Sequence, residues 1–294
     1  MPTVAGSRVH WLSVVTIGFM AAFVLAVGAL VAADVAYMLG ADPKVMREVF
    51  ESRELRYAVY LSLVTTVATL VLVVLFAVPV GYALSRYRFP GSVLLDAIVD
   101  LPIVLPPVVI GVSLLVVFHT RGGQWIQGLE WPAAVHAHWW LRWMAWLLGE
   151  RPLEFVYTPK GIVLAQFFVS ASYGIRASKA SFDAVPPHLE HLALTLGCTR
   201  SRAFRWVALP MARAGLAAGA VMAWARAVGV FGPLMIFAGA VPLRTETMPT
   251  AIYLELSIGR IEPALAISML MLALSMVALV TIHLVGARTR WWGT

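Results

Sequence analysis

Six long apolar stretches, separated by polar segments, limit what this chain can fold into more than any other feature. They cover residues 12–33, 57–85, 93–118, 161–180, 214–239 and 263–286. About 20 apolar residues make a helix long enough to cross the hydrocarbon core of a bilayer. The chain is 61% hydrophobic and only 13% charged, against about 25% charged in typical soluble domains. The sequence therefore predicts an all-α polytopic membrane protein with six transmembrane helices, and it excludes a soluble fold and a disordered chain.

These stretches divide the chain into an N-terminal part, a transmembrane domain and a tail. Residues 1–56 hold the first helix, which is too long for the apolar part of a signal peptide, and an outer polar segment. Residues 57–286 form the transmembrane domain, and residues 287–294 form a cytoplasmic tail. Two polar inserts interrupt the domain: a Trp-rich outer insertion at 119–160 and a basic cytoplasmic loop at 181–212.

The net charge of +7 comes from lysines and arginines in the polar segments, which is typical of cytoplasmic loops in membrane proteins and requires no nucleic-acid partner. Six spans place both termini on one side of the membrane. Basic residues divide almost equally between the two sides, so we assign the cytoplasm from the basic segments 86–92 and 181–212. The sequence thus predicts a multi-pass protein of the cell inner (plasma) membrane with both termini in the cytoplasm.

The basic loop contains the signals of a short helix. Pro186 and Pro187 favour a helix start, because proline suits the first helical turn. Gly197 suits the residue just past the end of that helix, where the backbone is often left-handed. The loop therefore predicts a helix that begins near Pro187 and ends just before Gly197.

A second short helix is predicted directly after the first. Thr199 or Ser201 can supply its N-cap, and it runs to Trp206, shortly before Pro210 at the start of the next span. Two short helices at right angles in a cytoplasmic loop form a docking surface rather than a catalytic pocket.

The spacing of this loop resembles that of the permease subunits of binding-protein-dependent ABC importers. Nine residues follow Gly197, and the aliphatic-x-Leu-Pro pattern then stands at 207–210. The family's Glu-Ala-Ala begins six residues before the glycine, where this chain has His191 followed by Leu-Ala, with Glu190 one place earlier. The resemblance implies that an ATP-binding cassette ATPase subunit docks on this loop. The docking residues that it implies are Glu190, His191, Gly197, Ser201 and Pro210.

Two further segments resemble the molybdate, tungstate and sulfate permeases of that family. One is Asp-Leu-Pro-Ile-Val-Leu-Pro-Pro-Val-Val-Ile-Gly at 100–111; the other is 225–239, where Val230 stands at a position that is acidic in the subfamily. The resemblance covers about 57–285. It implies the type I ABC importer permease fold and a translocation path for a small solute. The expected solute is an oxyanion such as molybdate or tungstate, and another small solute is the alternative.

The same resemblance implies the partners of the chain. They are the ATPase subunit, an external substrate-binding protein, a second copy of the permease in a homodimer, and membrane lipid. The chain lacks a GxxxxGK[ST] phosphate loop, so we expect ATP hydrolysis on the partner subunit and a transport role, not an enzymatic one, for this chain. The single cysteine, Cys198, excludes an internal disulfide framework and a CxxC metal site, and the seven scattered histidines form no HExxH motif. No metal and no cofactor are expected.

Prolines and glycines interrupt the third and fifth apolar stretches. Broken helices often line transport paths because their freed backbone groups need water or a ligand, although plain kinks are the alternative. The residues predicted to line the path are Pro106, Pro107, Arg226, Gly229, Phe231 and Gly232.

Arg226 lies well inside the fifth stretch, where an ionisable side chain must face the bundle interior or a wet cavity. It can attract an anion in the path. It can instead pair with Asp96 or Asp100, which share one face of a helix because they are four residues apart. We favour the ion pair as its role.

An ion-coupled secondary transporter is the main rival from another class. It needs a relay of carboxylates or histidines in the middle of the membrane, for which only Asp96, Asp100 and Arg226 are candidates. A membrane-embedded enzyme needs a cluster of His, Asp or Ser near one face, and the sequence shows none. The tryptophans of the outer insertion favour an interfacial amphipathic helix over stacking on a ligand. They are Trp125, Trp131, Trp139, Trp140, Trp143 and Trp146.

Overall fold

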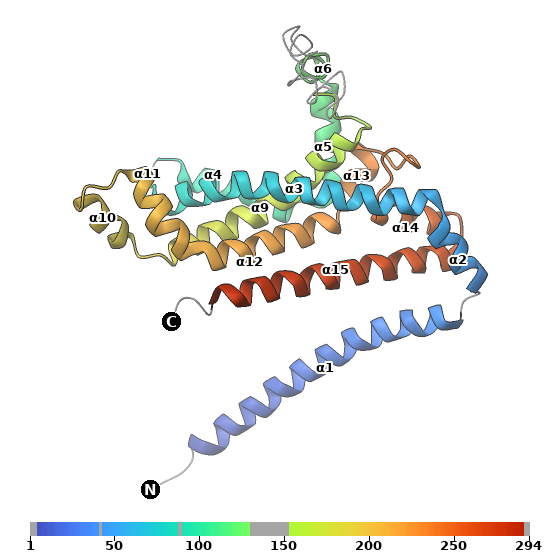
Figure 1. The fold of residues 1–294 in the computed structure, drawn as a ribbon, viewed down its shortest axis with the longest axis horizontal. Helices are drawn as coiled ribbons and strands as arrows, with labels where there is room; N and C mark the ends of the chain where they lie inside the picture. Colours follow the sequence, from blue (N-terminus) through green and yellow to red (C-terminus); the bar gives the residue numbers. More distant parts are fainter. Residues whose placement is uncertain (1–4, 41–42, 88–89, 130–152, 291–294) are drawn as a thin grey trace.

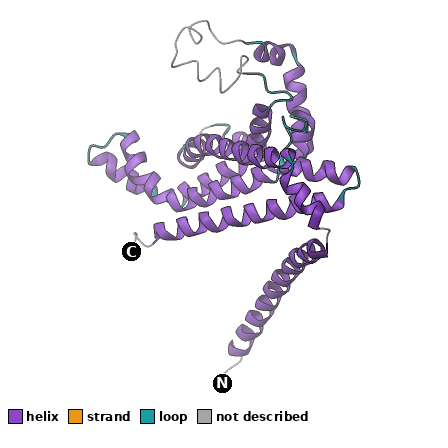
Figure 2. Cartoon of the chain, turned by 45° about the vertical axis from the view of Figure 1, so that its right-hand side comes forward, coloured by secondary structure: helices purple, strands orange, loops and turns teal. Residues whose placement is uncertain are grey.

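The computed structural model describes residues 5–40, 43–87, 90–129 and 153–290. The regular secondary structure in these ranges is helical, with no strand, which confirms the all-α class (Figures 1 and 2). In chain order the elements are α1 (Ala5–Gly40), α2 (Pro43–Glu51), α3 (Arg53–Arg86), α4 (Ser92–Val104), α5 (Pro107–His119), α6 (Arg121–Gln127), α9 (Pro159–Asp183), α10 (Pro187–Thr195), α11 (Arg200–Ala203), the π-helical turn η1 (Phe204–Ala208), α12 (Leu209–Val228), α13 (Gly232–Phe237), α14 (Met248–Ser257) and α15 (Ile261–Arg290).

Helices α3, α9 and α12 pack side by side and form the centre of the bundle. Small residues let these helices approach closely. A Cβ atom added to Gly174 of α9 would lie 2.6 Å from Val73 Cγ1 of α3. One added to Gly219 of α12 would lie 2.5 Å from Ala177 Cβ of α9. A larger side chain at either glycine would push the central helices apart.

The remaining long helices lie around this centre. Helix α15 runs beside α12 and packs against α2 and α14, whereas α1 diverges from the bundle (Figure 1). The apolar side chains of α1 between residues 13 and 37 are almost all exposed. In a membrane such a surface contacts lipid, since water would not solvate it favourably.

The six predicted spans correspond to α1, α3, α4 with α5, α9, α12 with α13, and α15. Within the described residues, three segments are long and apolar enough to cross a membrane by length and composition: 13–37, 53–86 and 200–228. Helices α4 and α5 add a fourth if the bent pair is one span. The multi-pass architecture is confirmed, and the count of six spans stays a prediction.

Two of the predicted spans are broken where the sequence indicated. Helices α4 and α5 meet at an angle of 111°. The residue before a proline is pushed out of the helical region, and here Leu105 and Pro106 both precede prolines and take extended ψ angles of 137° and 130°. Helix α12 ends before Gly229, and α13 begins at Gly232. The chain direction therefore changes inside both stretches.

The ends of the bundle differ in what they carry. Helices α10 and α11 project at one end, and α2 and α14 lie at the other (Figure 1). Helices α5 and α6 stand away from the bundle axis. Five of the six tryptophans predicted to lie in an interfacial helix fall in 130–152, outside the described residues, and Trp125 on α6 is exposed.

Candidate functional site

The first helix of the loop between α9 and α12 forms and ends as predicted. Helix α10 begins at Pro187, and Gly197 follows its end with φ of +88°. The Gly197 N–H donates to Leu194 O and the Cys198 N–H donates to Ala193 O, each at 3.0 Å. This pair of bonds is the Schellman arrangement, in which a left-handed residue turns the chain away from the helix axis.

The cap of the second helix is Thr199. Its hydroxyl oxygen accepts a hydrogen bond from the Arg202 N–H at 3.4 Å, which satisfies a free donor of the first turn of α11. Ser201, the other candidate, lies inside the helix and is exposed. Of the two caps proposed from the sequence, the structure selects the first.

The second helix does not end at Trp206, and that prediction is wrong. Helix α11 continues through η1 into α12 without a break. Pro210 has no N–H and cannot donate to the carbonyl of Trp206, so the ordinary helical bond is missing there. The Leu209 N–H donates instead to the carbonyl of Phe204, five residues back. The wider π-turn absorbs the proline, and the loop is joined rigidly to α12.

Glu190 fastens α10 to the C-terminal end of α3. Its carboxylate accepts hydrogen bonds from Arg86 Nε at 2.7 Å and from the Tyr82 hydroxyl at 2.6 Å. Arg86 also donates to the carbonyl of Val185 at 2.8 Å. Glu190 is only 7% exposed, so its carboxylate faces the bundle and not the surface of α10.

Sequence reasoning missed Arg86 and Tyr82 as functional residues. Arg86 served only as a basic residue that closes a span and helps to assign the cytoplasmic side, and nothing marked Tyr82 at all. Their partner lies 104 and 108 residues further along the chain, so no local pattern links them.

The outward surface of the same loop is apolar and exposed. Leu192 is 57% exposed, Leu196 78% and Trp206 80%. His191 is exposed beside them. A cavity of about 630 Å³ opens between this loop and the end of α3. Its lining residues are Tyr82, Ser85, Arg86, Tyr87, Pro187, Glu190, His191, Leu194, Arg200 and Ala203.

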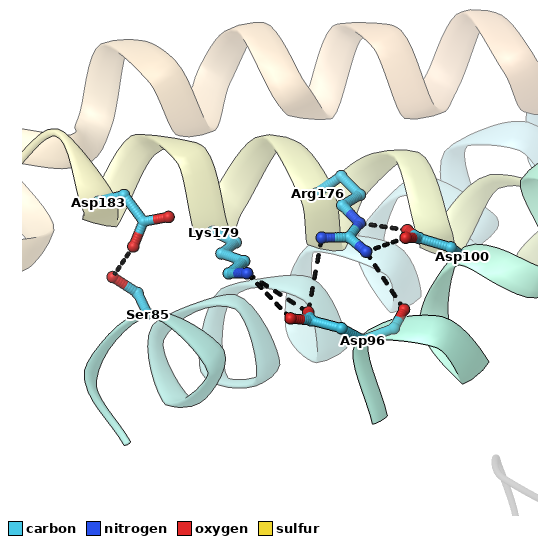
Figure 3. A network of polar contacts seen from close by, with 6 residues as sticks. All are labelled: Ser85, Asp96, Asp100, Arg176, Lys179 and Asp183. Carbon is cyan, nitrogen blue, oxygen red and sulfur yellow. Dashed lines mark hydrogen bonds and ion pairs between the residues drawn. The ribbon is translucent and has the colours of Figure 1, made fainter. Parts of the chain in front are cut away.

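A second polar network ties α4 to α9 (Figure 3). Arg176 donates to both carboxylate oxygens of Asp100 and, at 3.2 Å, to the backbone carbonyl of Asp96. Lys179 Nζ lies 3.1 Å from Asp96 Oδ2. The sequence could have indicated this network, because Asp96 and Asp100 share one helix face and Arg176 and Lys179 share another.

The predicted ion pair of Arg226 with Asp96 or Asp100 is therefore wrong. Helix α4 packs against α9, and the cations of α9 take both carboxylates. The guanidinium carbon of Arg226 lies 6.0 Å from the ring centre of Tyr173, also on α9. Within the described ranges Arg226 makes no ion pair. Its remaining predicted role is the attraction of an anion.

The two segments that resemble oxyanion permeases contact each other where the helices break. A Cβ atom on Gly111 of α5 would lie 2.7 Å from Pro233 Cα, and one on Gly232 of α13 would lie 2.7 Å from Val108 Cγ2. Only glycine allows this approach. Phe231, between the broken halves, has its ring 4.9 Å from that of Tyr253.

The remaining path candidates lie around the same breaks. Pro106 and Gly229 are exposed and Pro107 is half-buried. Val230 is 1% exposed in an apolar cluster with Ile110, Leu114 and Leu234. A carboxylate at this position would be buried without a partner, which explains in physical terms why valine suits this chain.

The described residues hold no group of three or more His, Cys, Asp or Glu side chains that could bind a metal ion. The loop carries exposed apolar side chains, and Arg226 lies near the break between α12 and α13. This arrangement fits a membrane transport component.

Comparison with known proteins identifies the family. Residues 76–291 match the family described as "Binding-protein-dependent transport system inner membrane component". The molybdate/tungstate transport system permease protein WtpB of Thermococcus kodakarensis is 38% identical over 177 residues, which are 60% of this chain and 58% of that protein. The chain thus spans less than two thirds of this relative's length. The molybdenum transport system permease protein ModB of Escherichia coli K12 is 34% identical over 218 residues, 71% of this chain and 85% of that protein.

The fold matches as well. A bacterial alginate ABC transporter, solved in complex with an alginate-bound periplasmic protein, superimposes with a TM-score of 0.66 at 17% identity, over 95% of this chain and 93% of the matched chain. This likeness shows the fold alone. With the family match over most of its length, the chain belongs to the inner membrane components of binding-protein-dependent transport systems, the permeases of type I ABC importers.

Proposed function

We propose that the chain is the permease subunit of an ATP-driven importer, with α10 as the helix on which a separate ATPase subunit docks. The way in which α10 is held supports this most directly. Glu190 fastens one face of it to α3, while Leu192 and Leu196 remain exposed beyond the bundle. Exposed apolar side chains on a fixed helix suit a protein interface. A movement of the docked ATPase subunit can then reach α12 through the unbroken helix of α11 and η1.

The proposal sets the orientation and the outer partners. The end with α10 lies in the cytoplasm together with both termini, and α2 and α14 lie outside. An external binding protein delivers the solute to the outer end, and two copies of the chain form a homodimer around the path, with lipid around it. The periplasmic protein in the alginate transporter structure supports the external partner.

The solute that we propose is a tetrahedral oxyanion such as molybdate or tungstate. The names of two relatives support this class. Arg226 supports it independently, because a guanidinium inside a bundle without a carboxylate partner attracts anions. The alternative is that the chain imports another small solute.

Docking is tested by placing a charge at Leu196, the exposed residue that caps the C-terminal end of α10. Leu196→Asp should fold and insert normally but lose co-purification with the ATPase subunit, because a carboxylate would be buried in the interface. The matched control is Leu256→Asp, a leucine on α14 that is 51% exposed at the opposite end. Equal recovery of the ATPase with both variants would contradict docking at α10.

Transport is tested with the complex in proteoliposomes, with labelled molybdate outside and ATP inside. Arg226→Ala should bind its partners and lower the initial uptake rate by about tenfold or more, as for ~1.4 kcal/mol of lost attraction. Arg226→Lys should retain part of the rate. The control is Arg47→Ala, an exposed arginine on α2.

The same assay separates the rival mechanism. An ATP-driven importer loses uptake when the ATPase subunit or ATP is omitted. Uptake by the chain alone, driven by an imposed proton or sodium gradient, would establish the ion-coupled secondary transporter instead.

A further inference from the structure

A second cavity, here named the outer cavity, lies at the end of the molecule opposite α10. Its volume is about 290 Å³, and it lies among α2, the first turn of α3, the segment before α14, α14 itself and the first turns of α15. Its lining includes the glutamates Glu48, Glu54, Glu246 and Glu255, together with Leu55, Arg260 and Ile267. Nothing in the proposed transport cycle uses these residues.

The charge of the outer cavity is strongly unbalanced. Four carboxylates face it and only one guanidinium, that of Arg260. The Arg260 Nη1 atom lies 3.4 Å from Glu255 Oε2, and its side chain is 56% exposed. One exposed arginine cannot neutralise four acids. The cavity therefore carries a net negative charge at neutral pH.

One of these carboxylates, that of Glu246, belongs to a buried residue, and a second, that of Glu255, has one buried oxygen atom. Glu246 is 8% exposed, and its side chain makes no hydrogen bond or ion pair with any described residue. Glu255 Oε2 is fully buried and accepts no hydrogen bond within the described ranges. Burial together with Glu255 and Glu54 raises the pKa of Glu246 above its ordinary 4.5. A buried carboxylate in this condition costs free energy until a cation reaches it.

The shape and lining of the cavity define the kind of cation that fits. Despite its four glutamates, no group of three or more His, Cys, Asp or Glu side chains in the described residues is arranged to hold a metal ion. A water molecule takes roughly 30 Å³ of liquid, so the cavity is far larger than a single small ion needs. Leu55 and Ile267 supply buried apolar surface beside the acids. A lysine or arginine side chain matches this pattern, with its aliphatic stem on the apolar wall and its charged end among the carboxylates.

We infer that the outer cavity receives a lysine or arginine side chain of the external binding protein. This inference rests on the proposed function. The cavity is lined mainly by polar elements outside the apolar spans, so a protein at the aqueous surface can reach it. Filling it would give Glu246 a cationic partner, and Glu255 a second one beside Arg260, only while the binding protein is docked. The site would thus add affinity and salt dependence to docking at the outer end.

The inference is tested with the full transporter in nanodiscs and its purified binding protein loaded with molybdate. Glu246→Gln combined with Glu255→Gln should weaken binding by about tenfold or more, since the arriving cation would lose its partners. The loss should shrink as salt rises. The matched control is Glu51→Gln, a carboxylate on α2 that is exposed and lies outside the cavity. Thermal unfolding of each variant confirms that it is folded.

A charge reversal identifies the partner residue. Glu246→Lys should abolish binding, and replacing one surface lysine or arginine of the binding protein by glutamate should restore it. Nanodiscs made only of phosphatidylglycerol contain no cationic headgroup. An effect of the double variant that vanishes in them would assign the cavity to a lipid amine and overturn the inference.

The failure of this inference differs from the failure of the proposed function. Wild-type protein that does not bind the external protein at all overturns both. Wild-type protein that binds it as tightly as the double variant does, at every salt concentration, overturns only the role of the outer cavity.

Discussion

Two glutamates at opposite ends of the molecule are equally buried but differ in what surrounds them. Glu190 is 7% exposed and Glu246 is 8% exposed. The first accepts hydrogen bonds from Arg86 and Tyr82, and the second has no polar partner for its side chain among the described residues. Burial alone therefore does not say what a carboxylate does. A buried carboxylate with hydrogen-bond partners in the chain stabilises the fold, whereas one without such partners is available to bind a cation.

The two glutamates should contribute to the free energy of unfolding with opposite signs. Removing one member of a buried ion pair leaves a stranded charge and destabilises the fold, whereas removing a buried charge that has no partner relieves a cost. Substitutions at the two ends should therefore change stability in opposite directions. Two experiments test this contrast, and a third tests the position of α10 at the paired end.

The largest expected effect is at the paired end. Arg86→Ala leaves Glu190 buried without its cation and should lower the free energy of unfolding by about 3–5 kcal/mol. The thermal midpoint in detergent measures the loss. Adding Glu190→Gln to Arg86→Ala should recover part of it, because no charge is then stranded. A single variant with the wild-type midpoint would show that the pair does not hold α10 to α3.

A smaller effect is expected at the end of α10. Gly197 has φ of +88°, and a Cβ atom there would meet nothing within 4 Å. The cost of Gly197→Val is therefore backbone strain alone, about 1–2 kcal/mol, relieved by turning α10 away from its position. Expression and membrane insertion should survive, while transport and transport-linked ATP hydrolysis fall. Gly197→Asn is the control, since asparagine tolerates this conformation. Normal transport by a well-expressed Gly197→Val variant would remove α10 from the coupling mechanism.

The sequence was informative where local backbone rules apply. Proline pairs and Gly197 impose their geometry on neighbours within a few residues, so the breaks at Pro106 and the end of α10 could be predicted. The length of the apolar stretches likewise predicted the helical class. These features depend on the chain near each residue and not on which helices become neighbours.

The sequence was uninformative where a contact depends on helix packing. The choice of Arg176 over Arg226 as the partner of Asp100 follows from α4 lying against α9. The burial of Glu190 follows from α10 folding back onto α3. The continuation of α11 into α12 was not predicted, because a proline usually ends a helix. Here the π-helical turn η1 accommodates Pro210. The outer cavity joins residues from both ends of the chain, which no local pattern could bring together.

The smallest change in stability is expected at Glu246, and there the substitution should stabilise the protein instead of destabilising it. The pKa of Glu246 is raised above 4.5 by burial and by its acidic neighbours. Between 4.5 and the raised value the folded protein binds more protons than the unfolded chain, so stability falls as pH rises through this window. Glu246→Gln should remove that loss. Its thermal midpoint should exceed that of the wild type at neutral pH, and the two should converge at acidic pH, where both forms are uncharged.

The binding protein makes this last prediction sharper. If a cation from the docked protein reaches Glu246, the carboxylate gains a partner and its pKa falls back, so the wild type should lose the pH-dependent deficit. The thermal midpoints of the wild type and of Glu246→Gln are measured from pH 4 to pH 8, with and without the binding protein. The more stable of the two forms should differ between these conditions. Glu246→Gln is the more stable form alone, and the wild type is the more stable form in the complex. A wild type that is already more stable than Glu246→Gln without any partner would mean that Glu246 is satisfied within the chain. The contrast with Glu190 would then disappear.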